Sequence, residues 1–324
     1  MLLAPDSHVA PSALALMLAF GIDQLWGEVP ARVHPVVWMG HVATVLRRHV
    51  PQSSPATALA GGALVALALP ALFGAAAFGL LRALPEGPLG AVCEALLLST
   101  TFAVRALGQA VLAVRDALEA QDLQAARRAL GQLCSRKTEE LDASQCSAAA
   151  IESAAENASD SFVAPMCFYV LFGLPGAMAY RAINTLDAML GYRGPLEYLG
   201  KASARLDDVA NLVPSRLTAG LMLIAGAGGA MPAVRVWWRD ARATASPNAG
   251  HPMAMMAGLL GVRLDKKGAY ALGAHLRQPG APDVTRAWKI VSTTAWLSVG
   301  AALAGLAGLT ALARSTGPSQ LGTF

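Results

Sequence analysis

The chain has 324 residues, of which 55% are hydrophobic and 14% are charged, and its formal net charge is +4. Average soluble domains carry about 25% charged residues, so this composition excludes a disordered chain and argues against an ordinary cytosolic globule. Aromatic residues make up only 6% of the chain. The apolar excess is Ala, Leu, Gly and Val, which suits helices that pack closely within a lipid bilayer. No basic run with interleaved aromatic residues occurs, so no nucleic-acid partner is expected.

The first apolar segment, residues 9–26, is expected to remain as a membrane anchor. No Lys or Arg precedes Arg32, so the basic region of a secretory signal is missing. Arg32, Arg47 and Arg48 follow the segment. The positive-inside rule therefore places the loop 27–55 in the cytoplasm.

Three further segments are long enough to cross a bilayer core, which takes ~20 residues. Windows 56–81 and 290–313 contain no ionisable side chain. Segment 89–114 carries Glu94 and Arg105, which we expect to face protein, because a charge facing lipid costs at least ~2.5 kcal/mol.

Segments 161–180 and 214–234 leave two alternatives open. If both cross, the polar block between them lies outside; if both are re-entrant or broken, all polar blocks lie on one side. Gly173, Pro175 and Gly176 favour a broken helix that lines a polar cavity. The composition of 116–133 predicts a cytoplasmic helix before this region.

These observations predict an all-α, polytopic integral membrane protein with about four to six membrane segments. We expect a single membrane-embedded domain over residues 1–324, with polar blocks at 27–55, 115–160, 181–213 and 235–289.

Three carboxylates follow one another at helical spacing in the block before residue 161. Glu152, Glu156 and Asp160 are four residues apart, so a helix places them along one stripe about 6 Å apart in rise. A cation would convert their mutual repulsion into binding, and oxygen ligands of this kind suit Mg²⁺ with phosphate. An exposed acidic helix face is the alternative.

The block 181–216 contains acids, amides and bases together. Acids that bind metal and bases that bind phosphate, at a membrane boundary, are what the handling of a polyanionic substrate requires. A salt-bridged surface helix is the alternative. Its polar members are Asn184, Asp187, Lys201, Arg205, Asp207, Asp208, Asn211 and Arg216. The turn-rich loop 246–252, with Ser246 and Asn248, offers backbone donors for an anion.

Five ordered motifs resemble the CobD/CbiB family of cobalamin biosynthesis, the adenosylcobinamide-phosphate synthases. The resemblance extends from about residue 14 to residue 312. The motifs are residues 23–28 with His34, Pro35 and Gly40; 152–165; 180–192; 204–208 with Pro214 and Arg216; and 239–241 leading into 246–252. The chain departs from the family pattern where Lys137 replaces an acid, so Lys137 is left out of the site.

The resemblance implies a ligase of the bacterial cytoplasmic membrane that forms a carbon–nitrogen bond. It implies ATP-dependent attachment of (R)-1-amino-2-propanol, or its O-phosphate, to adenosylcobyric acid, giving adenosylcobinamide or its phosphate. The expected cofactor is Mg²⁺ with ATP as substrate, and the corrinoid is also a substrate. Enzymes of cobalamin nucleotide-loop assembly are expected neighbours, and the active site is expected on the cytoplasmic side. The sequence has no P-loop motif, so any nucleotide site must be built otherwise.

Site roles follow from the same resemblance. The expected catalytic residues are Glu152, Glu156, Asp160, Asp187, Asp207 and Asp208, and of these Glu156, Asp160, Asp207 and Asp208 are the expected metal ligands. The expected substrate-binding residues are Asp23, His34, Asn157, Asn184, Lys201, Arg205, Asn211, Arg216, Ser246 and Asn248.

Two other functions fit parts of the pattern. Ionisable groups beside broken helices also mark the pathways of transporters. The long polar blocks and the lack of recognisable inverted halves argue against a carrier. A non-catalytic regulatory relative with the same fold is the third hypothesis.

Overall fold

The computed structural model describes residues 11–51, 53–134, 136–191, 196–226 and 230–316. These residues form helices and one two-stranded sheet, which confirms the predicted all-α class. The elements in chain order are α1 (Ala13–Leu25), the 3₁₀ turn η1 (Ala31–Val33), α2 (Pro35–His49), α3 (Pro55–Ala83), α4 (Pro88–Ser99), α5 (Val104–Glu119), α6 (Leu123–Leu130), α7 (Ala143–Ala158), the π-helical turn η2 (Ser159–Val163), α8 (Ala164–Leu190), α9 (Glu197–Ala210), α10 (Leu212–Ala225), α11 (Ala230–Asp240), α12 (Gly250–Leu260), β1 (Leu264–Lys266), β2 (Tyr270–Leu272) and α13 (Ala281–Thr316).

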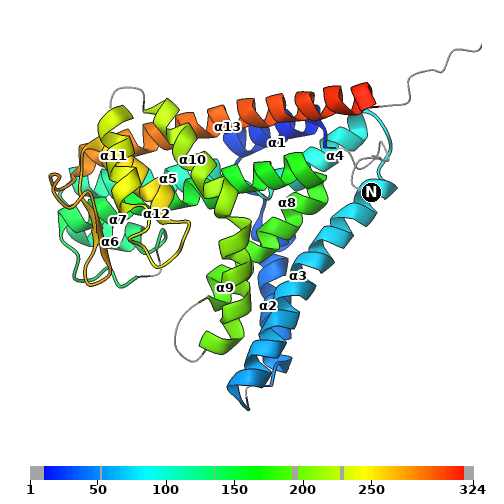
Figure 1. Ribbon diagram of the computed structural model, residues 1–324, viewed down its shortest axis with the longest axis horizontal. Helices are drawn as coiled ribbons and strands as arrows, with labels where there is room; N and C mark the ends of the chain where they lie inside the picture. The colour runs from blue at the N-terminus through cyan, green and yellow to red at the C-terminus, as the bar shows by residue number, and fades with distance from the viewer. Residues whose placement is uncertain (1–10, 52, 135, 192–195, 227–229, 317–324) are drawn as a thin grey trace, which may run out of the picture.

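The helices form two parts, a long layer and a limb that projects from it. Figure 1 shows a long layer that contains α13, α1, α4 and α5, and a limb of α2, α3 and α9 that projects from it. Two glycines let backbones approach within this limb. A Cβ atom at Gly62 would collide with the Leu199 carbonyl oxygen, and one at Gly200 would collide with that of Leu190. Helix α9 is therefore held tightly between α3 and α8.

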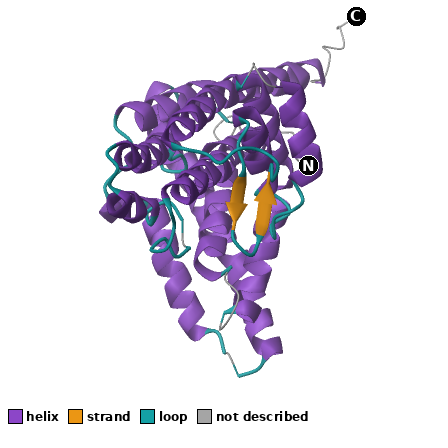
Figure 2. Ribbon diagram, turned by 90° about the vertical axis from the view of Figure 1, so that its left-hand side faces the viewer, coloured by secondary structure: helices purple, strands orange, loops and turns teal. Residues whose placement is uncertain are grey.

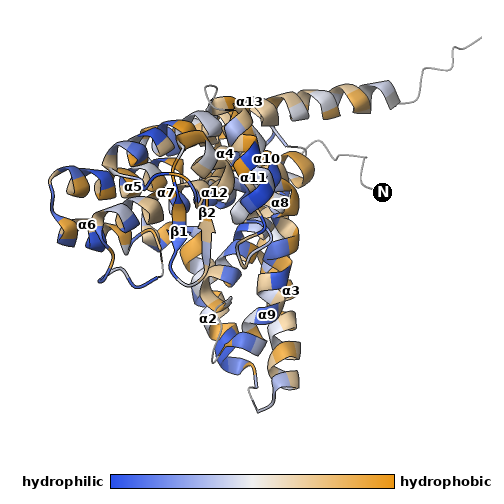
Figure 3. Ribbon diagram, turned by 60° about the vertical axis from the view of Figure 1, so that its left-hand side comes forward, coloured by the Kyte–Doolittle hydropathy of each residue, from blue (hydrophilic) through white to orange (hydrophobic). Residues whose placement is uncertain are grey.

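Four helical runs are long and apolar enough to cross a membrane, as a polytopic membrane protein requires. They are Pro55–Ala83, Pro88–Glu119, Ala143–Leu190 and Ala281–Ala313. Figure 3 shows mostly apolar colour along α3 and the outer part of α13, whereas more polar residues lie around α5, α6 and α7. The hydropathy thus differs between an apolar part and a polar end of the molecule.

Three predicted membrane segments are made of shorter helices in the structure. The segment expected at 89–114 is divided between α4, with 12 residues, and α5, with 16 residues. The segment expected at 9–26 is α1, with 13 residues, and the one expected at 214–234 is divided between α10, with 14 residues, and the separate helix α11. Residues 9, 10 and 227–229 of these predictions lie outside the described residues. Ser12 caps the start of α1, since its side chain accepts a hydrogen bond from the Ala15 amide at 3.2 Å.

The single helix predicted over 116–133 is wrong. Helix α5 ends at Glu119 and α6 begins at Leu123. Gln121 between them has a φ of 58°, which no α-helix accommodates. Asp122 then caps α6 by accepting a hydrogen bond from the Ala125 amide at 2.8 Å.

The segment predicted at 161–180 belongs to a longer run that begins at Ala143, and its break is confirmed. Gly173 in α8 has φ 66° and ψ −162°, a conformation that favours glycine. A second irregularity lies upstream, where η2 widens the helix between α7 and α8. Such π-helical turns are frequent at functional sites, and this one carries Asp160.

A β-hairpin follows α12 and lies on the polar end of the molecule (Figure 2). Strands β1 and β2 pair antiparallel, with Leu264 opposite Leu272 and Lys266 opposite Tyr270. Leu264 and Leu272 are fully buried and fix one face of the hairpin on the core.

Candidate functional site

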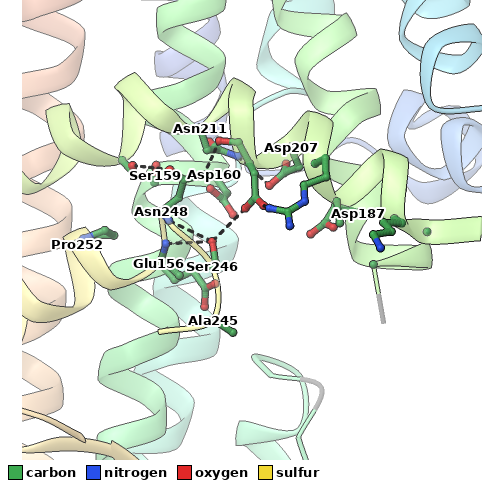
Figure 4. Close-up of a pocket in the computed structure, with 18 of the residues that line it drawn as sticks. Glu156, Ser159, Asp160, Asp187, Asp207, Asn211, Ala245, Ser246, Asn248 and Pro252 are labelled. Carbon is green, nitrogen blue, oxygen red and sulfur yellow. Dashed lines mark hydrogen bonds and ion pairs between the residues drawn. The ribbon is translucent and has the colours of Figure 1, made fainter. Parts of the chain in front are cut away.

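A cavity of about 610 Å³ lies where α7, η2, α8, α9 and the loop before α12 meet (Figure 4). Its lining residues are Glu156, Ser159, Asp160, Asp187, Gly191, Glu197, Gly200, Lys201, Ala204, Arg205, Asp207, Asp208, Asn211, Ser215, Ala245, Ser246, Asn248, Ala249 and Pro252. The motifs 152–165, 204–208 and 246–252, which are far apart in the sequence, thus all contribute residues to the lining of this cavity. The polar blocks 181–213 and 235–289 share this cavity, which favours the alternative that places them on one side of the membrane.

Carboxylates dominate the cavity. Glu156 comes from α7, Asp160 from η2, Asp187 from α8 and Asp207 from α9. Figure 4 shows Asp160 and Asp207 beside each other, with Asp187 farther along the wall. Burial raises the pKa of Asp207 to about 7, and the neighbouring Asp187 carboxylate adds to this rise. Ionised carboxylates at this spacing repel one another, so a bound cation or a proton is needed to stabilise Asp207 and Asp187 side by side.

A hydrogen-bond chain fixes one oxygen of Asp207. The Tyr180 hydroxyl donates to Asn211 Oδ1 at 2.9 Å, and Asn211 Nδ2 donates to Asp207 Oδ2 at 3.1 Å. The other oxygen, Oδ1, is buried without a hydrogen-bond partner among the described residues. A buried carboxylate oxygen of this kind is costly to leave unpaired, so this atom is available to a ligand.

The loop before α12 is tied to the ends of α9 and α10 through Asn248. Its Nδ2 donates to the Asp208 carbonyl at 2.7 Å, and its Oδ1 accepts from Ser215 Oγ at 3.3 Å and from Arg216 at 3.2 Å. Ser246 Oγ lies 3.5 Å from Asp208 Oδ1. Arg216 therefore holds Asn248 in place and does not itself line the cavity.

Two cations from α9 also line the cavity. Lys201 and Arg205 are four residues apart on that helix, and the Arg205 guanidinium lies 3.6 Å from the Asp208 carboxylate. Burial raises the pKa of Asp208, and Arg205 opposes this rise. The site thus places cations beside carboxylates, which suits a ligand with both phosphate and ammonium groups.

The predicted stripe of three acids divides in the structure. Glu156 and Asp160 line the cavity, but Glu152 does not, because it pairs with Arg136 at 3.3 Å. Asn157 also lies outside the lining and donates to the Ser153 carbonyl at 2.9 Å. The three predicted acids therefore do not form one site, although Glu156 and Asp160 share the cavity.

Asn184, Asp23 and His34 also lie outside the lining. Asn184 accepts a hydrogen bond from Arg181 at 3.3 Å. Asp23 is buried and accepts from the Arg105 amide at 3.2 Å. His34 Nδ1 accepts from the Val36 amide at 3.2 Å and so caps α2. Burial lowers the pKa of His34, which keeps the ring neutral for that role.

Sequence reasoning missed several polar residues of the cavity. Ser159, Glu197 and Ser215 are lining residues. Ser159 lies inside the motif 152–165 between two predicted acids, so its position offered a signal. Glu197 and Ser215 offered none, because they enter the site only through the packing of α9 and α10.

The carboxylate oxygens of the cavity provide some, but not all, of the ligands that a hard cation such as Mg²⁺ needs. Among the described residues no three His, Cys, Asp or Glu side chains converge closely enough to hold a metal ion by themselves. Carboxylate oxygens nevertheless suit Mg²⁺, which commonly binds through one or two carboxylates together with substrate phosphates and water. The unpaired Oδ1 of Asp207 is the best-placed single ligand.

Comparison with known proteins connects this site to a family. The family model described as CobD/Cbib protein matches residues 16–295. A cobalamin biosynthesis protein CobD of Dehalococcoides mccartyi is 40% identical over 269 residues, covering 82% of this chain and 87% of the relative. A probable cobalamin biosynthesis protein CobD of Methanothermobacter thermautotrophicus is 42% identical over 262 residues, covering 80% and 86%. A protein of the same description from Thermococcus kodakarensis is 40% identical, covering 87% and 92%.

No solved structure shows significant similarity to the chain. The family model extends over most of the sequence and includes every residue that lines the cavity. The chain belongs to the CobD/CbiB family.

Proposed function

We propose that the protein acts in cobalamin biosynthesis as an ATP-dependent ligase that joins (R)-1-amino-2-propanol, or its O-phosphate, to adenosylcobyric acid. The observation that carries this proposal is the shared cavity, in which Asp160, Asp187 and Asp207 lie with Lys201 and Arg205. The names of the similar proteins support the pathway, and the cavity chemistry supports the reaction class.

A carboxylate does not condense with an amine in water without activation. We propose that the corrinoid carboxylate takes the γ-phosphoryl group of ATP, so that a phosphorus–oxygen bond forms as ADP leaves. The amine then attacks the acyl carbon, forms the amide and releases phosphate. Mg²⁺ held by Asp207 and Asp160 would neutralise phosphate charge during this chemistry.

The cavity volume supports a proposed arrangement of the substrates. About 610 Å³ suits a nucleotide or a small amine ester, whereas a corrin ring is much larger. The corrinoid carboxylate would therefore approach at the cavity mouth. Lys201 and Arg205 would bind phosphate, and an acid such as Asp187 would bind the ammonium group until it loses its proton. Cations in the polar blocks support a cytoplasmic site in a bacterial inner membrane.

The test is ATP-dependent conversion of adenosylcobyric acid by detergent-solubilised protein, with the product identified by mass spectrometry. Parallel reactions with aminopropanol and its phosphate ester identify the amine. We expect a new amide with one amine and none with Asp160→Asn, while that variant still inserts in the membrane. No covalent product from the wild type, with substrate uptake in sealed vesicles, would instead indicate a transporter.

A second measurement tests the acyl phosphate. Labelled ADP should exchange into ATP in the presence of adenosylcobyric acid and without amine. Amide formation without such exchange would leave the ligase in place and contradict the acyl phosphate step.

A further inference from the structure

Helix α11 leads directly into the loop that carries Ser246 and Asn248 to the cavity. With 11 residues it is too short to cross a bilayer core, which takes about 20 residues. One face of the helix packs on the protein, and the opposite face is exposed. The composition of the exposed face therefore indicates what α11 contacts outside the protein.

The inner face of α11 is fixed by contacts with α12 and with the end of the β-hairpin. Ala233, Val236 and Asp240 are buried on this face. A Cβ atom on Gly258 of α12 would collide with the Ala233 backbone, so the two helices pack at close range. Asp240 Oδ2 accepts a hydrogen bond from the Gly273 amide at 2.7 Å. These contacts hold the opposite face of α11 away from the core.

The outer face combines apolar and cationic side chains. Four exposed residues form it: Met231, Arg235, Trp238 and Arg242. Intervals of four, three and four residues place them on one stripe of a helix. One further helical hydrogen bond follows Asp240, so Arg242 lies in the turn directly after α11. Trp238 is 81% exposed and Met231 is 64% exposed, so the apolar part of the stripe is not covered by the protein.

The two arginines of this stripe are not neutralised by the protein. Among the described residues, neither Arg235 nor Arg242 forms a hydrogen bond or an ion pair. The neighbouring Arg239 differs, because its guanidinium lies 2.6 Å from the Asp240 carboxylate. The stripe therefore presents positive charge beside an exposed indole ring. Such a combination is typical of helices that lie at the boundary between lipid headgroups and acyl chains.

We propose that α11 lies in the interfacial region of the bilayer and binds the headgroups of anionic phospholipids. Arg235 and Arg242 contact the lipid phosphates, since guanidinium groups form strong hydrogen bonds with phosphate. Met231 and Trp238 enter the boundary with the acyl chains. The cavity lining resumes at Ala245, three residues after Arg242, so this contact fixes one wall of the cavity at the membrane surface.

The neighbouring tryptophan provides a matched control for lipid contact. Trp237 is adjacent to Trp238 in the sequence, but its ring faces α12, where its centroid lies 5.6 Å from that of the His251 ring. Its indole nitrogen is buried. Lipid should therefore reach Trp238 and not Trp237.

Fluorescence quenching by lipid distinguishes these two side chains. Full-length protein is placed in nanodiscs of phosphatidylcholine and phosphatidylglycerol, with or without bromine atoms near the start of the acyl chains. The quenching that is lost in Trp238→Phe reports on Trp238, and the quenching that is lost in Trp237→Phe reports on Trp237. We expect brominated lipid to quench Trp238 several-fold more than Trp237. Quenching of Trp238 no stronger than that of Trp237 would overturn the proposal, and iodide quenching of Trp238 would then show that this face meets water.

Helix α6 supplies a control for charge. Arg128 is exposed and, in the part of the chain that the structure describes, forms no hydrogen bond or ion pair. The exposed residue one turn before it on the same face is Gln124, so a polar neighbour stands where Arg235 has Met231. Arg128→Gln and Arg235→Gln change the net charge of the protein equally.

Native mass spectrometry of the detergent-solubilised protein, titrated with phosphatidylglycerol, measures the contribution of each arginine. Arg235→Gln and Arg242→Gln should each weaken binding roughly 5-fold, whereas Arg128→Gln should match the wild type. Phosphatidylcholine, which has no net charge, should bind all variants equally. Unchanged phosphatidylglycerol binding in both stripe variants, or an equal loss in Arg128→Gln, would contradict the headgroup contact. Neither measurement uses ATP or adenosylcobyric acid, so both outcomes are independent of the ligase proposal.

Discussion

Two regions of this protein carry the same kinds of polar residue and use them differently. Around the start of the chain, the Asp23 carboxylate accepts hydrogen bonds from the Arg105 amide and from the Gln24 side chain. Around the cavity, Asp207 keeps one oxygen without a partner. The difference is whether nearby backbone amides satisfy the side chain. Where they do, the residue stabilises the fold, and where they do not, it is available to a ligand.

The largest expected effect is at the cavity. Asp207→Asn keeps the shape of the side chain but removes the negative charge that we propose binds the metal–nucleotide. Product formation should fall by about 10²–10³-fold, the size seen when one electrostatic contact to a transition state is lost. The rate per mole of folded protein measures this effect, with membrane insertion as control. Near-normal turnover would show that the charge of Asp207 is not needed for the reaction and would contradict its role as a metal ligand.

Asp23→Ala should act on stability instead. The substitution leaves the Arg105 amide without its side-chain acceptor, at a cost of about 1–3 kcal/mol. Thermal unfolding in detergent should occur at lower temperature, while kcat of the folded fraction should stay within about 2-fold of the wild type. A loss of kcat with unchanged stability would show that Asp23 acts in substrate binding.

Arg216→Ala tests a residue that lies outside the cavity lining and contacts it through Asn248 and Ser215. We expect an activity loss of about 10-fold, which corresponds to about 1.4 kcal/mol. Arg216→Lys should rescue part of the activity if its cation need only contact Asn248 Oδ1. A loss as large as that of Asp207→Asn would indicate direct contact with substrate.

The smallest expected effects concern pH. Burial and Asp187 raise the pKa of Asp207 to about 7, so activity that needs its ionised form should decline as pH falls through about 7. Asp187→Asn removes the like charge and should move this decline to lower pH. An unchanged acid limb would exclude Asp207 as the titrating group.

The raised pKa of Asp207 also predicts that the free energy of unfolding falls as pH rises, whereas activity is expected to rise with pH. A carboxyl whose pKa is raised on folding favours the folded state fully below the unfolded value of 3.8, and this contribution is lost as pH rises through about 7. Because this contribution is lost progressively between pH 3.8 and about 7, Asp207→Asn should stabilise the protein most at pH 8 and less at pH 5. Thermal unfolding at the two pH values measures the difference.

Some features follow from the sequence because they depend on local patterns. Apolar windows long enough to cross a bilayer predicted four long helical runs. Gly173 predicted the break in α8, since its conformation favours glycine. The motifs of residues 152–165, 204–208 and 246–252 were predicted to lie together, and all contribute to the cavity.

Other features were decided by tertiary structure. The acid stripe was predicted from regular helical spacing, but Glu152 pairs with Arg136 and does not line the cavity, whereas Glu156 and Asp160 do. Composition alone does not distinguish a satisfied carboxylate such as Asp23 from an unpaired one such as Asp207. Long-range contacts make that distinction: Arg105 supplies the partner for Asp23 from another helix, whereas the packing of α7, α8 and α9 buries Asp207 beside other acids.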